Sequence, residues 1–307
     1  MDVRRLDLLR ELSERGSVTA VARATHRTPS AVSQQLKVLE REAGVPLTER
    51  SGRGLALTHA GRELARSAAD VATALERANA LWDEFRNHPS GEVSLATFPT
   101  AGQMLLPGLL QRLTEVPGLV VTCSDRDPEL EDFPALTSDF DVVLAHSTLG
   151  QVPWVGRGLH VTPLMREPLD VALPLGHRLA ERPNVTPHDL VGETWIGVPP
   201  GYPFNRVLDE IEVVSGHPIV TSQRFGDTRV TEAFVAAGLG IALLPCFTAG
   251  GLDDRGLVLK TLSGVTAARN IVALTRPDRA ERLAVRTVLD ALVAESERVQ
   301  RANAGRS

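Results

Sequence analysis

The sequence contains no apolar run that approaches the ~18 residues needed to cross a membrane. Its first residues lead into an amphipathic pattern and lack the apolar block of a secretory signal peptide. The two cysteines, Cys123 and Cys246, cannot form a disulfide framework and lack the spacing of metal ligands. Both lie in or beside apolar segments, where a free thiol is expected to be an inert small side chain and not a redox sensor. These absences predict a cytoplasmic protein with no membrane partner.

Lysine is almost absent, since Lys37 and Lys260 are the only two, and the formal net charge is −5. This balance argues against a simple basic coat for nucleic acid. The charge is unevenly distributed, because residues 1–90 carry a net charge of +2 and residues 91–307 one of −7. Such an asymmetry is expected if only the first segment approaches an anionic partner.

Fingerprints of catalysis are also missing. The sequence holds no Gly-x-Ser-x-Gly elbow and no phosphate-binding or dinucleotide-binding glycine loop in its proper context. Gly238 and Gly240 follow a predicted helix and not a strand, which is the wrong setting for phosphate binding. We therefore predict no catalytic residue, no metal site and no cofactor.

Three short helices are predicted at the start of the chain. Apolar residues recur every three or four positions, Gly16 ends the first helix, and Ser17 caps the second. Thr28 caps the third helix and Pro29 takes its first position, where the missing N–H costs nothing. This succession, with a tight turn before the third helix, is typical of a helix-turn-helix DNA reader. The expected helices run over Val3–Glu14, Val18–Thr25 and from Pro29 to Gly44.

The third helix has one apolar and one polar face. The apolar face carries Val32, Leu36 and Leu39 at helical spacing. On the other face, glutamine can bridge N6 and N7 of adenine, serine can donate or accept, and lysine can meet a phosphate or a guanine. The alternative is a face that is simply solvated. The polar side chains are Ser30, Ser33, Gln34 and Lys37.

Two short strands, Pro46–Arg50 and Leu55–Thr58, flank a glycine-rich turn that holds Arg53. An arginine between glycines at a hairpin tip can reach a phosphate or the narrow minor groove. The pair predicts a wing beside the helix-turn-helix.

A long helix is predicted from His59 to about Asn87, which gives it a length of ~43 Å. Apolar residues alternate along it at spacings of four and three, the a and d positions of a coiled coil. A single stripe of this kind needs a partner, so we predict a homodimer. The alternative is packing against the chain's own domains. The stripe consists of Leu64, Ala68, Val71, Leu75, Ala78, Trp82 and Phe85.

Beyond Gly91 strands and helices alternate, which predicts an α/β sandwich with mostly parallel sheets and a ligand crevice at the carboxyl ends of strands. The expected strands are Val93–Phe98, Leu119–Cys123, Asp141–Ala145, Leu169–Leu173, Trp195–Val198, Ile219–Phe225, Ile241–Leu244 and Asn270–Thr275. The expected helices are Ala101–Glu115, Phe204–Ser215, Asp227–Ala237 and Asp278–Arg301.

Several stretches in the right order make the chain similar to the LysR-type transcriptional regulators over essentially its whole length. The family commonly has an aromatic residue or leucine where Thr48 stands, which predicts looser packing between the wing and the next helix. The matching stretches are Gly16–Ala22, Thr28–Leu36, Leu39-Glu40, Gly44–Leu47, Glu49-Arg50, Leu57-Thr58, Ala60-Gly61, Leu105–Pro107, Glu167–Leu169 and Gly238–Pro245.

The resemblance implies a multidomain α/β protein. An N-terminal all-α winged helix-turn-helix is followed by a coiled-coil linker helix and by an effector domain similar to type 2 periplasmic binding proteins, with a cleft between two subdomains. The expected bounds are 1–58 for the DNA-binding domain, 59–88 for the linker helix, 89–307 for the effector domain, about 91–162 plus 268–302 for subdomain one, about 163–267 for subdomain two, and Val161–Pro163 and Thr266–Arg269 for the crossings between them.

The resemblance also implies site residues. It places the start of the third helix in the DNA major groove and Arg53 of the wing on DNA, with Lys37 and Arg50 beside them. The DNA-binding set is Thr28, Pro29, Ser30, Ser33, Gln34, Lys37, Arg50 and Arg53.

Around the cleft the resemblance places four segments. The first turn of the helix at Thr100 offers free N–H groups that can hold an anion such as a carboxylate. Ordinary capping and loop chemistry is the alternative for each segment. The expected ligand is a small organic effector, and the expected residues are Thr100, Ala101, His146, Ser147, Tyr202, Phe204, Asp227 and Thr228.

These observations predict a sequence-specific DNA-binding regulator whose activity a small effector modulates. Two chains pair through their linker helices to read a dyad-symmetric promoter site. The resemblance implies that two dimers form a tetramer that bends DNA, with RNA polymerase as a further partner. Two other classes stay open: a solute-binding or transport component, which would explain residues 91–302 but not the helix-turn-helix, and an enzyme, for which we find no catalytic groups.

Overall fold

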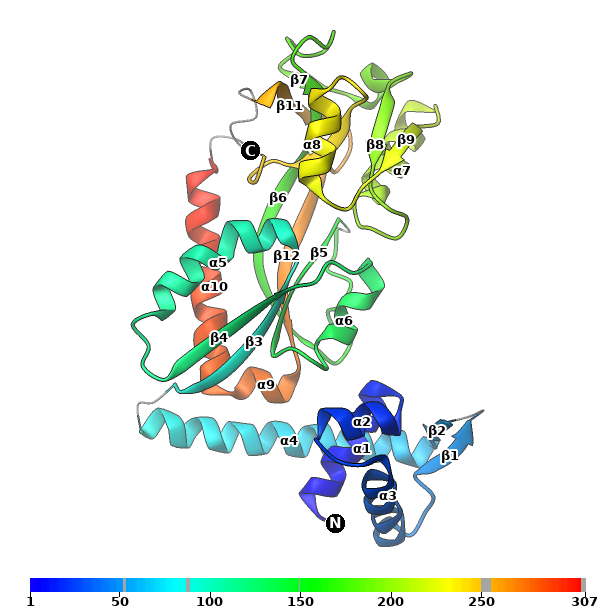
Figure 1. Ribbon diagram of the computed structural model, residues 1–307, viewed down its shortest axis with the longest axis vertical. Coiled ribbons are helices and arrows are strands. Elements are labelled where there is room, and N and C mark those ends of the chain that lie inside the picture. Colours follow the sequence, from blue (N-terminus) through cyan, green and yellow to red (C-terminus); the bar gives the residue numbers. More distant parts are fainter. Residues whose placement is uncertain (52–53, 87–88, 149, 250–254, 305–307) are drawn as a thin grey trace.

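The computed structural model describes residues 1–51, 54–86, 89–148, 150–249 and 255–304. A small helical unit lies at one end of a long helix, and an α/β domain stands on the rest of that helix (Figure 1). None of the described helices is long and apolar enough to span a membrane. The elements of the first part are α1 (Val3–Arg15), α2 (Val18–Ala24), α3 (Pro29–Ala43), β1 (Thr48–Ser51), β2 (Gly54–Leu57) and the long helix α4 (His59–Phe85).

The helix ends of the small unit follow from local sequence. Gly16 and Gly44 end α1 and α3 in the left-handed conformation, with φ of 64° and 71°. The Ala31 N–H donates to the side chain of Thr28 at 3.2 Å, which caps α3 as predicted. Ser17 holds the N-cap position of α2, but its side chain makes no capping hydrogen bond. The three helices enclose a core built from Leu8, Leu9, Leu12, Val21, Ala22, Val32, Leu36 and Leu39.

The wing is hydrogen-bonded to α3 through Thr48, the position at which looser packing is expected from the sequence. The backbone N–H and the hydroxyl of Thr48 both donate to Oε1 of Glu40 on α3, at 2.8 Å each. These hydrogen bonds replace the apolar contact that a larger side chain would make. In the first turn of α4, Gly61 lies so close to Leu47 that a Cβ would collide with the Leu47 carbonyl oxygen. Glycine is therefore required at this contact.

The α/β domain has ten strands among the described residues, together with two short 3-10 turns and several helices. The strands are β3 (Gly91–Thr97), β4 (Leu119–Asp125), β5 (Val142–Ser147), β6 (His160–Pro174), β7 (Asn184–Val185), β8 (Thr194–Gly197), β9 (Val220–Arg224), β10 (Ala242–Pro245), β11 (Leu257–Leu262) and β12 (Ala268–Thr275). The helices are α5 (Pro99–Leu113), α6 (Phe133–Leu136), α7 (Asn205–Ser215), α8 (Thr228–Ala236), α9 (Pro277–Glu281) and α10 (Leu283–Ala302).

The main sheet is mixed, so the predicted mostly parallel arrangement is wrong. Its order is β4-β3-β5-β12-β6-β11-β7, with β10 also paired to β6. β3 is parallel to β4 and β5, whereas β12 is antiparallel to β5 and β6, and β6 is antiparallel to β10 and β11. The cause is that the chain leaves the first subdomain along β6 and returns along β12 in the opposite direction.

The crossing between subdomains lies later on β6 than predicted. Leu164 and Met165 belong to the core of subdomain one, and Leu169 belongs to that of subdomain two. The chain therefore crosses between Met165 and Leu169, and the expected crossing at Val161–Pro163 is wrong. β6 is a continuous strand of 15 residues, so no break in its pattern marks the boundary.

Other local expectations also differ. Leu119–Cys123, expected to be a buried strand, belongs to the edge strand β4, on which Cys123 is exposed, whereas Cys246 is buried. The last helix is divided at Arg282, whose backbone is extended with ψ of 129°. Strands β7 and β11 were not predicted.

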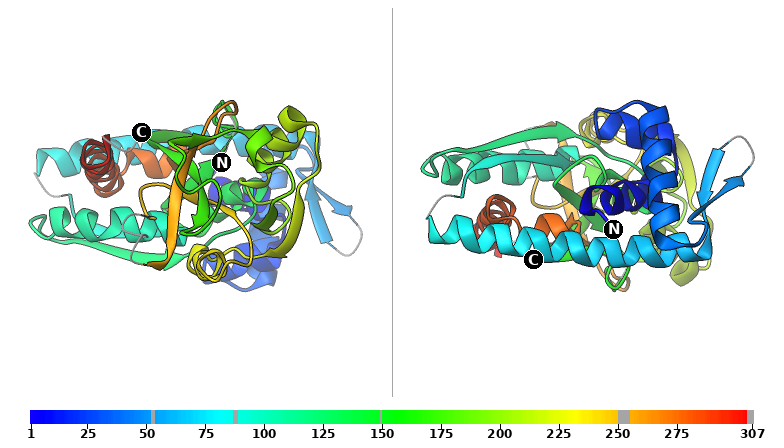
Figure 2. Two further views of the ribbon diagram at one scale, coloured as in Figure 1. Left: turned by 90° about the horizontal axis from the view of Figure 1, so that it is seen from above. Right: turned by 90° about the horizontal axis from the view of Figure 1, so that it is seen from below.

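Seen from below, α4 extends along the molecule, and α1–α3 lie beside one half of α4 (Figure 2).

Candidate nucleic-acid interface and ligand pocket

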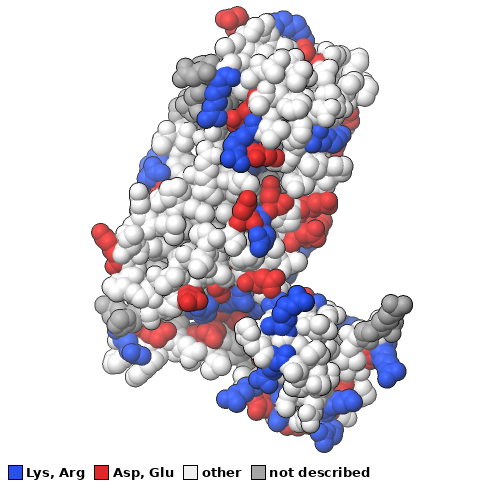
Figure 3. All heavy atoms as spheres, viewed as in Figure 1, with Lys and Arg blue, Asp and Glu red and all other residues white. Residues whose placement is uncertain are grey.

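The polar face of α3 is open to solvent. Val32, Leu36 and Leu39 are buried on its opposite side. Lys and Arg side chains are spread over the small helical unit at the foot of the molecule (Figure 3). Arg53 lies outside the described residues. Of the other predicted DNA contacts, Ser33 is half-buried and the exposed ones are Thr28, Pro29, Ser30, Gln34, Lys37 and Arg50.

The second half of α4 exposes an apolar stripe. Val71 and Leu75 are 39% and 49% exposed, and Trp82 and Phe85 are 60% and 79% exposed. The rings of Trp82 and Phe85 stack with centroids 5.5 Å apart. Ala78, which lies between Leu75 and Trp82 in the sequence, is also exposed. These five residues, which we call the α4 stripe, retain the coiled-coil spacing predicted from the sequence.

The first two positions of the predicted stripe are not available to a partner. Leu64 packs against the core of the helix-turn-helix, and Ala68 is buried. Both α1 and α9 pack against α4, so part of this helix face is covered within the chain. For Leu64 and Ala68 the predicted dimer contact is therefore wrong, and the free stripe begins at Val71.

Buried charges dock the helical unit onto the α/β domain. Arg276, at the start of α9, lies 2.9 Å from Glu11 and 2.7 Å from Glu14, both on α1. In return, Nη1 of Arg10 lies 2.7 Å from Oδ2 of Asp278. Burial raises the pKa of Glu14 to about 7, against the opposing effect of Arg10. We call this cluster the α1–α9 joint, and it ties the first helix of the DNA-binding domain directly to subdomain one.

Replacing Arg276 with methionine is expected to loosen this joint. The substitution removes the cation closest to Glu14, while Arg10 stays 3.4 Å from Glu11 and 3.9 Å from Glu14 and Arg15 stays 2.7 Å from Glu11, so the expected loss is about 1–3 kcal/mol. Hydrogen exchange of the α1 amides should accelerate, and urea unfolding should occur earlier. Arg301→Met removes an exposed arginine that lies 3.7 Å from Glu297, so its effect should be below about 1 kcal/mol. Equal effects of the two substitutions would contradict a structural role of the joint.

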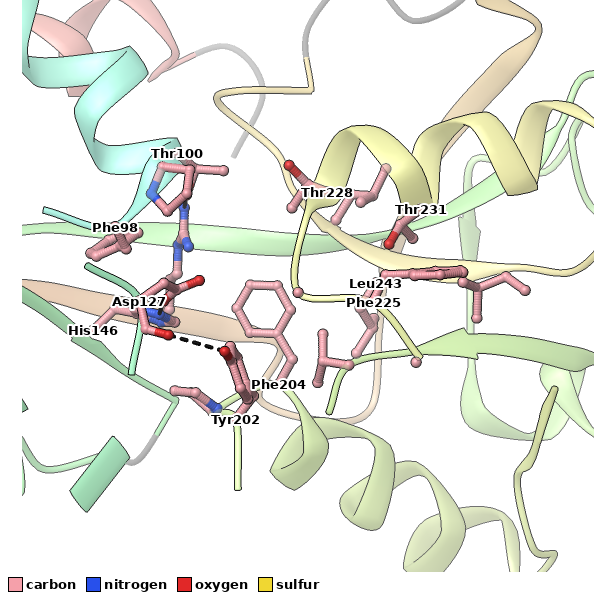
Figure 4. A pocket seen from close by; sticks show the side chains of 18 residues that line it. Phe98, Thr100, Asp127, His146, Tyr202, Phe204, Phe225, Thr228, Thr231 and Leu243 are labelled. Atoms are coloured by element: carbon pink, nitrogen blue, oxygen red, sulfur yellow. Dashed lines mark hydrogen bonds and ion pairs between the residues drawn. The ribbon is translucent and has the colours of Figure 1, made fainter. Parts of the chain in front are cut away.

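A pocket lies between the two subdomains, beside the crossing of β6 and β12 (Figure 4). Its cavity volume is about 40 Å³. Since an enclosed water needs about 10–15 Å³ on this measure, the cavity accepts only a few atoms unless the subdomains separate. Subdomain one contributes Phe98, Pro99, Thr100, Asp127, His146 and Arg269. Subdomain two contributes Ile196, Gly197, Val198, Tyr202, Pro203, Phe204, Phe225, Gly226, Thr228, Thr231, Leu243 and Leu244.

Arg269, one wall of this pocket, is buried together with its counter-ion. Its guanidinium lies 2.6 Å from Oε2 of Glu167, which is fully buried. Nη2 also donates to the hydroxyl of Thr100 at 2.8 Å. The guanidinium carbon lies 5.0 Å and 5.6 Å from the ring centres of Phe98 and Phe204. The charge of Arg269 is therefore compensated within the protein.

His146 and Asp127 form a second polar pair. His146 Nε2 lies 3.8 Å from Asp127 Oδ1, which is too long for a hydrogen bond. Within the described part of the chain, His146 Nδ1 and Asp127 Oδ1 are buried and have no hydrogen-bond partner. Burial lowers the pKa of His146 to about 4, and nearby Arg269 acts in the same direction. The imidazole is therefore neutral near pH 7.

The structure brings together part of the predicted effector set. Thr100, His146, Tyr202, Phe204 and Thr228 line the pocket.

Three predicted effector residues do not line it. Ala101 and Ser147 are fully buried within subdomain one. Asp227 instead caps α8, where its carboxylate accepts from the Arg229 N–H at 2.9 Å. For these three, capping and core packing replace the expected ligand contact.

Sequence reasoning missed Asp127 and Arg269. Asp127 follows an edge strand, and Arg269 lies near the start of β12, far along the chain. A charged residue inside an otherwise apolar strand was the available signal for Arg269, since such a charge is buried only with a partner.

Two family profiles match the chain. "Bacterial regulatory helix-turn-helix protein, lysR family" matches residues 3–62, and "LysR substrate binding domain" matches residues 86–297. Among curated relatives, the transcriptional dual regulator GltC of Bacillus subtilis (strain 168) is 28% identical over 247 residues, which cover 80% of this chain and 81% of GltC.

Solved structures share the fold over almost the whole length. A full-length OxyR variant from Pseudomonas aeruginosa has a TM-score of 0.66 at 19% identity, covering 95% of this chain and 98% of that one. Full-length CbnR, solved in complex with its target DNA, has a TM-score of 0.54 at 21% identity, covering 96% of this chain and 100% of that one.

Proposed function

The chain belongs to the LysR family of DNA-binding transcriptional regulators. We propose that it binds a dyad-symmetric promoter site as a homodimer. We further propose that its DNA contacts change when a small organic effector enters the cleft. The observation that carries this proposal is the pocket between two subdomains joined only by β6 and β12 among the described residues. An effector that touches both walls favours one relative orientation of the subdomains and selects it from those already present.

The α1–α9 joint supports a route from the cleft to DNA. Because Arg276 and Asp278 follow β12 directly, a rotation of subdomain one about the β6–β12 crossing moves α9 and, through the buried ion pairs, α1. The helix-turn-helix then turns with it, which alters the spacing of two recognition helices in a dimer. Identical DNase footprints with and without a bound effector would contradict this mechanism.

Oligomerisation is part of the proposal. The α4 stripe supports a dimer through the linker helices. The exposed edge strands β4 and β9, with Val120 51% and Val220 62% exposed, support a second contact through which two dimers form a tetramer.

The remaining parts of the proposal concern partners. We propose RNA polymerase as a further protein partner. We propose the cytoplasm as the compartment, because the target is DNA. We also propose that the protein has no catalytic role and no resident cofactor apart from the effector. Membership in a family of transcriptional regulators supports these statements. Turnover assays on any bound effector test the absence of catalysis.

The experiment that tests the function selects bound fragments from sheared genomic DNA of the source organism. Enrichment of a few intergenic sites with a shared dyad is the expected result, and the flanking genes then suggest candidate effectors. If no fragment is enriched at salt near physiological, with or without effector candidates, the DNA-binding function is overturned.

Gln34 and Arg53 are expected to differ in how they contribute to DNA binding. Gln34→Ala should relax base preference at one position of the site, by about 1–3 kcal/mol of discrimination. Arg53→Ala should weaken binding to all sequences alike and reduce its dependence on salt, because it removes a phosphate or minor-groove contact. Titrations on the selected site and on single-base variants, at several salt concentrations, distinguish the two. Unchanged affinity and footprint for both variants would contradict the assignment.

A further inference from the structure

The pocket contains a carboxylate without a counter-charge. Arg269 is paired with Glu167 at 2.6 Å, so it does not compensate Asp127. His146 is the one basic group within 4 Å of Asp127 among the described residues, and it is neutral near pH 7. Oδ1 of Asp127 accepts no hydrogen bond there. A carboxylate oxygen that is buried and unpaired is costly, so a partner from outside the protein is expected.

The second unpaired atom lies on the same wall. His146 is 5% exposed and lines the cavity, and its Nδ1 has no hydrogen-bond partner within the described residues. Because Nε2 faces Asp127, we assign the single ring proton to Nε2, which makes Nδ1 an acceptor. Both unpaired atoms on this wall therefore accept hydrogen bonds, and a ligand must donate to them.

The local field is negative on this side of the cleft. Burial raises the pKa of Tyr202, and Asp127 and Glu129 add to that rise. The hydroxyl of Tyr202 donates to the Asp127 carbonyl at 3.0 Å, which holds the loop against the pocket (Figure 4). Asp127 lines the cavity, and Glu129 is near enough to act on Tyr202 in the same direction.

Two polar groups near the cavity that could meet an anion already have partners. The first turn of α8 is capped by Asp227, and the hydroxyl of Thr100 at the start of α5 accepts from Arg269. The remaining surface is largely apolar and includes the rings of Phe98, Phe204 and Phe225. Aromatic faces attract cations as well as apolar groups.

From this arrangement, and resting on the proposed function, we propose that the effector is a small organic amine. Its protonated amino group binds Asp127 as the missing counter-charge and donates a second hydrogen bond to His146 Nδ1, while its short apolar body lies among the phenylalanine rings.

Three probes that share a four-carbon body test the ligand class. Calorimetric titration of the full chain with butylamine, butanol and butyrate should rank butylamine tightest. Both probes can donate to the carboxylate of Asp127, but only the ammonium brings an opposite charge. Because charge-assisted hydrogen bonds are roughly twice as strong as neutral ones, butylamine should exceed butanol by about five- to tenfold. Butyrate should bind more weakly still, since it meets Asp127 with like charge. This ranking uses the unaltered protein and does not depend on how a variant folds.

Asp127→Asn tests the site. It should lower butylamine affinity by about 10- to 100-fold while butanol affinity stays nearly constant. The matched control is Asp125→Asn, which removes the same charge from the same segment but no atom that lines the cavity, so its effect should not exceed about twofold. Thermal melts of both variants check that they are folded.

The amine assignment is overturned if butyrate binds more tightly than butylamine, or if butylamine does not bind to the unaltered protein. It is also overturned if Asp127→Asn leaves the butylamine affinity unchanged, because butylamine would then be an adventitious additive only. None of these results contradicts the proposed regulator function, because the genomic DNA selection is made without these probes. Conversely, failure of that selection leaves the ranking of the probes intact.

Discussion

Leu75→Glu should leave the protein monomeric and lower its affinity for a two-half-site DNA by about 10²- to 10⁴-fold, the gain that linked binding of two modules provides. Leu75 lies at the middle of the α4 stripe and is 49% exposed, so glutamate is tolerated in the single chain. In a dimer, two such carboxylates would face each other across an apolar seam, where burial of an unpaired charge is strongly unfavourable. Sedimentation and DNA titration measure the two effects.

The matched control at this position is Leu75→Met. Methionine keeps the apolar area and approximate volume, so the dimer and the DNA affinity should change little. A melting curve shows whether either variant has altered the fold of the chain. Dimeric Leu75→Glu with undiminished DNA affinity would show that the α4 stripe is not the seam, and the exposed edges β4 and β9 would then be the dimer contact to examine.

Arg269→Leu should destabilise the effector domain by about 3–5 kcal/mol. Glu167 is fully buried and would lose its cation, while the hydrogen bond that it accepts from the Phe247 N–H at 3.0 Å remains. The pair spans the β6–β12 register at the crossing between the subdomains, so its loss affects the orientation of both. Urea unfolding followed by tryptophan fluorescence reports on both cores, because Trp154 belongs to one and Trp195 to the other.

The double variant Arg269→Leu, Glu167→Leu distinguishes charge burial from packing. Removing both charges leaves no uncompensated ion, and such replacements of buried pairs are often neutral or stabilising. The double variant should therefore recover most of the stability lost in Arg269→Leu. If it is as unstable as the single variant, the cost lies in the lost ring contacts with Phe98 and Phe204, and the ion-pair argument is wrong.

The DNA-binding end of the molecule was the most accurately predicted. Its features are local: Gly16, Thr28 and Gly44 define helix ends through their own backbone and side-chain preferences. The alternation of Val32 and Leu36 with polar residues fixes which face of α3 is exposed. The long helix α4 was likewise visible from its period.

The effector domain was predicted less well, because its arrangement depends on contacts between distant residues. No local pattern shows that β12 runs antiparallel to β6, or that Arg269 faces Glu167. The same holds for Leu64 and Ala68, which carry the coiled-coil spacing although Leu64 is partly buried and Ala68 is buried within the chain. Periodicity identifies an apolar face and does not identify which surface covers it.

The sequence by itself determined the family, the helix-turn-helix and its reading face, the linker helix and the existence of a two-part α/β domain, because each of these is written in neighbouring residues or in motifs of fixed spacing. Only the tertiary structure decided how much of the α4 stripe remains free, that α1 is tied to α9 by buried charges, and that Asp127 faces the cleft without a counter-charge. The physical reason is that burial and electrostatic compensation depend on everything within a few ångströms of a group, and for these residues many of the neighbours come from other elements of the fold, as Arg276 does for Glu11.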